Sequence, residues 1–245
     1  MRGWLVLIAV LAACGTPMDI IDSDGGGSDL GSGSGGGSGS SAACGAAPAG
    51  ESGQATYYDA DGTGACSFDA GSDFLIAAMN ATDYGDAVWC GGCVDVAGPN
   101  GHVTVRIVDK CPGCSQGSLD LSETAFAKIA PLSAGRVDIT WQETACPVTG
   151  PISYDFQDGS SQFYTAIQIR NHRYPIAAVA TVDATGSATP IARVDYNYFV
   201  ATKGLGTGPY KLRVTDDRGE TLDDTGVALD TSSPQPGAAQ FPICP

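Results

Sequence analysis

The sequence is poor in positive charge and lacks an apolar run long enough to span a bilayer. Only 12 residues are Lys or Arg against 27 Asp and Glu, which gives a formal net charge of −15. A nucleic-acid backbone is bound by clustered Lys and Arg, so this balance argues against nucleic-acid binding. The longest apolar stretch, residues 4–13, is far shorter than the ~20 residues of a membrane-spanning helix, which excludes a multi-pass membrane protein.

Charged residues make up only 16% of the chain, whereas Gly (34) and Pro (14) are abundant. Gly and Pro favour turns and interrupt helices, so the composition predicts a mostly β protein with few helices. The length leaves room for one large domain or for two of about 100 residues each.

The first residues have the order of a bacterial export signal, with Arg2 followed by an apolar run and small residues. Cys14 directly follows Leu-Ala-Ala, which resembles a lipobox whose Cys becomes the lipidated N-terminus. The alternative is a plain signal peptide with an incidental Cys. Gly15 stands where an Asp would retain a lipoprotein in the inner membrane, so we expect an exported outer-membrane or cell-surface lipoprotein, or a form released from it. Residues 15–43 are rich in Gly and Ser and predict a disordered tether.

Eight cysteines remain after Cys14, and an even number in an exported chain predicts a disulfide framework. The competing interpretation is a zinc ribbon, because Cys90 and Cys93, followed by Cys111 and Cys114, form two CxxC pairs at zinc-ribbon spacing. The oxidising compartment and the four further cysteines favour disulfides. A thioredoxin-like role is not favoured, since no βαβ pattern surrounds either pair.

Two compositional blocks follow the tether, residues 44–147 and 148–245. The first predicts a helix with Ser122 as its N-cap, Phe126 and Ile129 on its apolar face and Pro131 as its stop. Its predicted strands cover residues 54–58, 87–89, 93–96, 102–109 and 136–142. The second block lacks helical periodicity and predicts a small β-sandwich. Its strand-like runs cover residues 152–157, 163–170, 176–183, 191–199, 210–215 and 226–229.

One segment of the first block carries candidate chemistry. A predicted strand delivers Asp109 to its end, and Asp120 comes just before the predicted helix. Together with Thr56, Tyr57 and Tyr58, these carboxylates suggest a carbohydrate cleft, because sugars offer hydroxyls to carboxylates and flat CH faces to rings. The structural alternatives are a helix N-terminal acid at Asp120 and a turn cap at Asp109.

Ordered motifs in both blocks resemble those of expansins. In the first block they are Gly53-Gln-Ala-Thr-Tyr57, Gly64-Ala-Cys66, Trp89-Cys-Gly-Gly-Cys-Val-Asp95, Val108-Asp-Lys-Cys-Pro112 and Leu119-Asp-Leu-Ser122. Segments 159–175, 194–199 and 205–208 continue the match and look like bacterial expansins. The resemblance implies a six-stranded double-psi β-barrel, related to that of family-45 endoglucanases, followed by an immunoglobulin-like carbohydrate-binding β-sandwich.

The resemblance also implies roles for individual residues of the first block. Thr56, Asp109 and Asp120 match the polar floor of the first-domain groove, and Asp120 matches the acid that donates a proton in the related hydrolases. Cys111 stands where some bacterial members have a groove Tyr, whereas the plant members share the Cys.

Phe163, Tyr164 and Tyr196 match the aromatic platform of the second domain, where rings stack on a β-glucan chain. The family usually has Trp at the first two positions, so we expect weaker cellulose binding than in Trp-bearing members. Adjacent Phe163 and Tyr164 can both face outward only at a bulge or a strand edge. The alternative is that Phe163 packs with Ile167 and Ile169.

Inverting hydrolysis needs a second carboxyl group about 6.5–9.5 Å from the acid. The family-45 base lies four residues after a Thr, which here is Ala60, and Asp59 is one residue short and so on the other face of a strand. We therefore expect non-lytic loosening of cell-wall polysaccharide. The alternatives are an endo-β-glucanase using Asp120 and Asp59, and a surface adhesin that only binds polysaccharide.

By resemblance to the plant-type pattern, we expect Cys66 to pair with Cys90 and Cys93 with Cys146. The remaining cysteines suggest the pairs Cys111–Cys114 and Cys44–Cys244. Residues 44–146 hold 13 acidic and four basic side chains, so cellulose or another neutral β-glucan is the expected ligand. We expect no cofactor, no metal, a membrane contact only through the lipid, and a monomer. His102 and His172 are single and far apart, and we interpret both as structural.

Overall fold

The structure, a computed structural model, describes residues 44–244. The predicted export signal, Cys14 and the tether lie outside the described residues. Within residues 44–244, no helix has both the length and the apolar character needed to cross a membrane.

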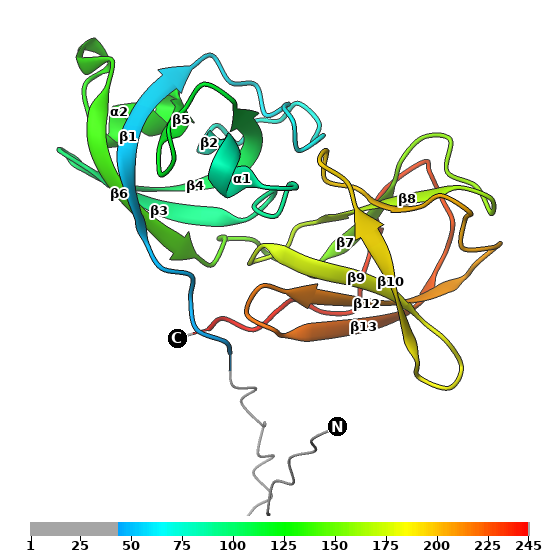
Figure 1. The fold of residues 1–245 in the computed structure, drawn as a ribbon. Helices are drawn as coiled ribbons and strands as arrows, with labels where there is room; N and C mark the ends of the chain where they lie inside the picture. The colour runs from blue at the N-terminus through cyan, green and yellow to red at the C-terminus, as the bar shows by residue number, and fades with distance from the viewer. Residues whose placement is uncertain (1–43, 245) are drawn as a thin grey trace, which may run out of the picture. The chain divides into compact units, whose positions relative to one another are not determined.

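Six strands close into a barrel in the order β1-β5-β2-β4-β3-β6 (Figure 1). They are β1 (Glu51–Tyr58), β2 (Ile76–Asn80), β3 (Cys93–Gly98), β4 (Gly101–Cys111), β5 (Leu119–Ser122) and β6 (Val137–Thr144). The β1–β5 and β2–β4 pairs are parallel and the others are antiparallel. Inward side chains such as Val94, Val105, Ile107 and Leu121 are fully buried and fill the barrel.

Three short helices accompany the barrel strands. They are α1 (Ala81–Tyr84), α2 (Glu123–Ile129) and the 3-10 helix η1 (Leu132–Ala134). The predicted N-cap of α2 is confirmed, because the Ser122 hydroxyl oxygen accepts a hydrogen bond from the backbone N–H of Ala125. Phe126 and Ile129 are completely buried on its inner face, and the helix ends just before Pro131. The helix therefore closes one side of the barrel, directly after the strand that carries Asp120.

The second half of the chain forms eight strands in the order β13-β12-β9-β10-β11-β8-β7-β14. They are β7 (Ser153–Phe156), β8 (Thr165–Arg170), β9 (Ile176–Val182), β10 (Ala188–Arg193), β11 (Phe199–Ala201), β12 (Tyr210–Asp216), β13 (Thr221–Val227) and β14 (Gln235–Pro236). Strand β10 pairs with β9 on one side and β11 on the other, which links the two halves of the sheet. Side chains of β7, β8, β9 and β12 share one buried cluster, so the two halves pack on a common core. The all-β expectation is confirmed.

Several strands differ from their predicted bounds. Residues 87–89 are not a strand, because Ala87 adopts a left-handed conformation with φ 60° inside a turn. The predicted strand 191–199 is two strands, β10 and β11, separated by a turn in which Asn197 has φ 67°. Strands β2 and β5 were not predicted. A short all-buried run such as β2 has no alternation to reveal it.

The structure contains the four expected disulfides, Cys44–Cys244, Cys66–Cys90, Cys93–Cys146 and Cys111–Cys114. The zinc-ribbon alternative is wrong, because the two CxxC pairs are divided among three different disulfides. Within the part of the chain described, no group of three or more His, Cys, Asp or Glu is arranged to hold a metal ion.

The barrel and the second sheet belong to one compact unit. Gln168 on β8 and Asn197 both donate side-chain hydrogen bonds to the backbone carbonyl of Cys66, at 2.9 and 3.2 Å. Glu143 on β6 pairs with Arg218 beyond β12, at 2.5 Å between Oε1 and Nε. These contacts join residues more than 70 positions apart, so they depend on both halves being folded.

Candidate functional site

The parallel pairing of β1 and β5 creates the polar centre of the candidate groove. Its register places Thr56 opposite Asp120. The Thr56 hydroxyl donates a hydrogen bond to Oδ1 of Asp120 at 2.6 Å. Both residues are half-buried, so the second carboxylate oxygen of Asp120 can still accept from a ligand.

Asp109 lies at the end of β4 and holds the adjacent loop. Its Oδ1 accepts from the backbone N–H of Ala65 at 2.6 Å and from that of Lys110 at 2.8 Å. A Cβ on Gly64 would come within 2.5 Å of the Asp109 side chain, so only glycine allows the loop to approach this closely. Asp109 thus has the capping contacts expected of a turn acid and also lies beside the groove.

Tyr58 lies two residues after Thr56 on β1 and so on the same face of the strand. Its phenol oxygen is buried, and no residue described by the structure forms a hydrogen bond with it. Burial raises the pKa of Tyr58, and the negative charges of Asp109, Asp120 and Asp61 raise it further. The phenol therefore stays protonated, with a hydrogen-bond donor among three carboxylates.

The sequence analysis assigned no individual role to Tyr58 and did not identify Asp61. The spacing of residues in the sequence could not have identified either of them, because their side chains come close together only through the closure of the barrel and the path of the loop after β1. Asp61 accepts hydrogen bonds from the Thr63 backbone N–H and hydroxyl, which lower the pKa of Asp61. It is therefore ionised over the whole physiological range.

Tyr57 does not join the groove residues. Its ring packs on Phe126 of α2 with the ring centroids 4.9 Å apart, on the opposite face of β1 from Thr56. Cys111 is half-buried in its disulfide with Cys114, and the Pro-Gly turn between them is exposed. The loop closed by this disulfide continues past Ser115 to Ser118, and Thr56, Cys114 and Ser118 line one small hollow.

The three platform candidates lie close together in the second half. Phe163 and Tyr164 precede β8, in a turn where Ser161 and Tyr164 form an isolated β-bridge. Because the two residues lie in a turn, their side chains need not point to opposite faces as neighbours in a strand would. Phe163 is 75% exposed, so the alternative in which it packs with Ile167 and Ile169 is wrong.

Tyr164 and Tyr196 are neighbours, although 32 residues separate them in sequence. Burial raises the pKa of Tyr196, and the adjacent Tyr164 phenol, which shares a hydrogen bond with it, contributes to the rise. The Tyr196 ring also lies 5.9 Å from that of Tyr198. Tyr164 and Tyr198 pack in one small cluster with Ala166 and Val200, which fixes the rings from below.

A short chain of contacts connects the groove side of β4 with the platform. Lys110, next to Asp109, lies over the ring of Tyr84 at 5.1 Å. The Tyr84 hydroxyl donates to the backbone carbonyl of Asp195 at 3.0 Å, immediately before Tyr196. The polar residues and the platform are therefore held by the same set of contacts between the barrel and the sheet.

The chain is similar to known proteins across both halves. A family model described as lytic transglycolase matches residues 50–141. Expansin-YoaJ from Bacillus subtilis (strain 168) is 39% identical over 180 residues, which are 70% of this chain and 77% of that protein. Expansin-like protein 2 from Dictyostelium discoideum is 29% identical over 184 residues, 70% of this chain but only 45% of that protein. A solved structure of a mutant Clavibacter michiganensis expansin in complex with cellohexaose is similar with a TM-score of 0.73 and 30% identity, and covers 80% of this chain and 100% of that one.

Proposed function

The chain belongs to the expansin family, and from this premise we propose that it binds neutral β-glucan chains and loosens their non-covalent contacts without cleaving them. The Clavibacter michiganensis expansin in complex with cellohexaose supports a cello-oligosaccharide as the ligand. The proposed binding surface comprises the platform residues Phe163, Tyr164 and Tyr196 and the groove residues Thr56 and Asp120.

The observation that carries the proposal is the exposure of the platform. A Phe ring that is 75% exposed beside two Tyr rings costs solvation free energy unless a ligand covers it. A glucan chain offers flat CH faces to such rings and hydroxyls to the groove. Stacking on each ring contributes about 0.5–1.5 kcal/mol beyond the area buried.

The groove chemistry supports loosening over cleavage. Asp120 is paired with the Thr56 hydroxyl, and Asp109 is committed to two backbone N–H groups. Asp59 follows the last residue of β1 and is exposed. In this arrangement the second carboxylate oxygen of Asp120 would accept a hydrogen bond from a sugar hydroxyl, and so compete with the hydrogen bonds between neighbouring glucan chains.

Binding is tested by pulldown on microcrystalline cellulose. The double variant Tyr164→Ala with Tyr196→Ala should bind at least tenfold more weakly, because two stacking surfaces are lost. Phe163→Ala should also weaken binding, whereas its matched control Phe74→Ala, which removes a ring that is 43% exposed on the barrel, should not. Binding that survives the double variant unchanged would remove the platform from the proposal.

Loosening is tested by two assays on the same preparations, weakening of cellulose paper and release of reducing sugar from soluble β-glucan. We expect weakening without sugar release, and loss of weakening in Asp120→Asn. Intact binding with neither effect would instead identify an adhesin.

A cleaving enzyme would need a base opposite Asp120, and Asp61 is a second candidate for it besides Asp59. Asp61 and Asp120 both act on the Tyr58 phenol, and Asp61 is ionised. Sugar release that is lost in both Asp61→Asn and Asp120→Asn would establish an endo-β-glucanase. Asp59→Asn is the control, since the enzyme hypothesis drawn from sequence assigned the base to Asp59.

We also propose that the chain is exported and anchored through lipidated Cys14, with residues 44–147 and 148–245 as its two domains. Four disulfides support an oxidising compartment. Mass spectrometry of the N-terminal peptide from the producing cell tests the anchor: a diacylglycerol adduct on Cys14 supports it, and an unmodified peptide overturns it.

A further inference from the structure

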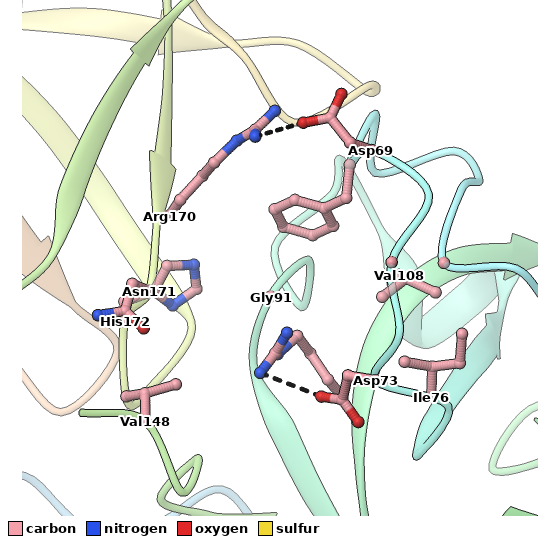
Figure 2. A pocket seen from close by; sticks show the side chains of 13 residues that line it. Asp69, Asp73, Ile76, Gly91, Val108, Val148, Arg170, Asn171 and His172 are labelled. Carbon is pink, nitrogen blue, oxygen red and sulfur yellow. Dashed lines mark hydrogen bonds and ion pairs between the residues drawn. The ribbon is translucent and has the colours of Figure 1, made fainter. Parts of the chain in front are cut away.

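A pocket lies where the barrel meets the second sheet, apart from the groove and the platform. Its volume is about 240 Å³, below the roughly 300–1,000 Å³ of pockets for drug-sized ligands. Barrel residues of the loop after β1 and of β4 form one wall, and residues 170–172 and Val148 form the other (Figure 2). None of the proposed groove or platform residues lines it. The pocket matches one small, compact ligand.

The lining combines apolar surface with paired charges. Phe68, Ile76, Val108 and Val148 supply the apolar part. Arg106 lies 3.4 Å from Asp73. Arg170 lies 2.6 Å from Asp69, and Figure 2 shows these two side chains pointing toward one another. Arg170 has a second carboxylate partner in Asp155, at 2.7 Å. Both guanidinium groups are therefore neutralised, and a free anion would meet at least as much negative as positive charge.

Arg106 retains hydrogen-bonding capacity. Its single ion pair is long, its side chain is 33% exposed, and a guanidinium carries five N–H donors. Asp69 is 81% exposed and its carboxylate can accept further hydrogen bonds. The polar rim thus offers donors and acceptors side by side, which suits hydroxyl groups because each hydroxyl both donates and accepts.

His172 adds a buried acceptor to the pocket. Its Nδ1 lies 2.7 Å from the carbonyl oxygen of Tyr174, so Nδ1 carries the proton and Nε2 carries the lone pair. Burial, together with the positive charges of Arg106 and Arg193, lowers the pKa of His172 to about 4, so the ring is neutral. Among residues 44–244, nothing donates a hydrogen bond to Nε2. The structural role expected of His172 therefore accounts for only one of its two nitrogens.

Gly91 keeps this acceptor and the Phe68 ring close together. A Cβ on Gly91, which has φ 77°, would lie 2.5 Å from His172 Nε2 and 3.1 Å from Phe68 Cζ. Both the conformation and the space therefore require glycine. The result is an aromatic ring edge and a lone pair at one end of the pocket, with Arg106 lining the same cavity.

We propose that this pocket binds a single neutral hexopyranose unit, with hydroxyls bonded to His172 Nε2 and Arg106 and with its apolar CH groups against Phe68. The ligand is neutral because carboxylates balance the arginine charges in the pocket. It carries hydroxyls because the pocket offers both hydrogen-bond donors and acceptors, and it is one sugar unit because the volume of the pocket admits no more. The unit comes either from a free monosaccharide or from the end of a glucan chain. The site is separate from the proposed glucan-binding surface and does not depend on it.

The test uses the imidazole nitrogens as reporters. The chain has only two histidines, so a protein labelled with ¹⁵N-histidine gives four assignable ring signals. On titration with methyl β-glucoside, the His172 Nε2 signal should move upfield and saturate, because it accepts a hydrogen bond. His102, which lies 3.1 Å from Asp95 and is exposed, should stay unchanged as the internal control.

Two variants probe the pocket from different walls. Arg106→Met should weaken the apparent affinity about tenfold, as expected for one lost charge-assisted hydrogen bond. Val148→Trp should fill the cavity and abolish the shift, and the resolved His172 signal reports that the fold is intact. The Tyr164→Ala, Tyr196→Ala double variant should titrate like the parent, which separates this site from the platform.

Titrations with two further sugars identify the source and the charge of the ligand. If cellohexaose and methyl β-glucoside shift the Nε2 signal equally at the same molar concentration, the pocket recognises the end of a glucan chain. If only the glucoside shifts it, the ligand is a free monosaccharide. A stronger response to methyl glucuronide would refute a site for neutral sugars. Absence of any Nε2 shift at the solubility limit of the sugar, or a shift unchanged in both Arg106→Met and Val148→Trp, would overturn the proposal.

Discussion

The buried ion pair between Glu143 and Arg218 should be the most sensitive single contact between the barrel and the second sheet. The Glu143 side chain is completely buried and that of Arg218 is 7% exposed, with 2.5 Å between Oε1 and Nε. Arg218 also lies over the Tyr174 ring at 5.1 Å and donates to the carbonyl oxygen of Gly45 at 3.3 Å. Gly45 adjoins Cys44 of the disulfide to Cys244, so the same arginine holds both ends of the folded region.

Arg218→Met removes the cation but keeps most of the side-chain volume. The carboxylate of Glu143 then lies in the interior without its partner, and removing one member of a buried pair costs about 3–5 kcal/mol. The matched control is Arg213→Met on β12, which breaks a pair with Asp223 that has two hydrogen bonds, at 2.6 and 2.7 Å. That pair is exposed to solvent, so its loss should change the free energy of unfolding very little.

Urea unfolding of the oxidised protein measures both variants. Trp89 and Trp141 report on the barrel through fluorescence, because both pack within its core. Adding Glu143→Met to Arg218→Met should recover part of the lost stability, since no carboxylate of this pair is then left without its cation. Equal free energies of unfolding for Arg218→Met and Arg213→Met would refute the argument from burial.

Three further perturbations follow from single contacts. Burial and the adjacent Glu143 raise the pKa of Asp217, so the folded state retains a proton on this side chain. The stability that this proton provides is complete below the ordinary aspartate pKa and is lost as the pH rises through the raised pKa. The urea midpoint should therefore decrease as the pH is raised from about 5 to about 8, and a constant midpoint would contradict this. Replacing Cys44 and Cys244 by Ser should lower the free energy of unfolding by about 5 kcal/mol, because the disulfide closes a loop with a sequence separation of 200. An unchanged midpoint in urea would show that this disulfide does not constrain the unfolded chain. Ser122→Ala should lower the free energy of unfolding by at least about 1 kcal/mol, because the buried hydroxyl caps α2 and also donates to the backbone carbonyl of Phe74, and an unchanged midpoint in urea would contradict this.

The sequence motifs predicted the residues of the groove better than the strands that carry them. The pairing of Thr56 with Asp120 depends on β5, a strand of four residues that the helix pattern beginning at Leu121 concealed. Strand β2 was missed because both of its faces are buried, so its side chains do not alternate in polarity. Helix α2, in contrast, was predictable because cap, apolar face and stop all lie within ten consecutive positions.

Contacts between distant residues mark the limit of sequence-based prediction. Glu143 and Arg218 are 75 residues apart, and each alone has the sequence pattern of an exposed strand or turn residue. The orientation of Tyr57 was equally hidden, because only the phase of β1 decides whether it or Tyr58 faces the groove. For Phe163 the required departure from alternation was predictable, but the turn that provides it was not.

The distribution of hydrogen bonds around Thr56 and Asp120 agrees with the proposal that the groove binds a glucan chain without cleaving its glycosidic bonds. Asp109 accepts two backbone N–H groups of its own loop through Oδ1, which fixes the groove wall. Asp120 uses Oδ1 for the Thr56 hydroxyl, so in the proposed binding mode its other oxygen accepts a hydrogen bond from a glucan hydroxyl. Such a hydrogen bond stabilises a separated chain in its ground state. Inverting cleavage would in addition require a base on the other side of the glycosidic bond from Asp120, which is the role that the Asp61→Asn variant tests.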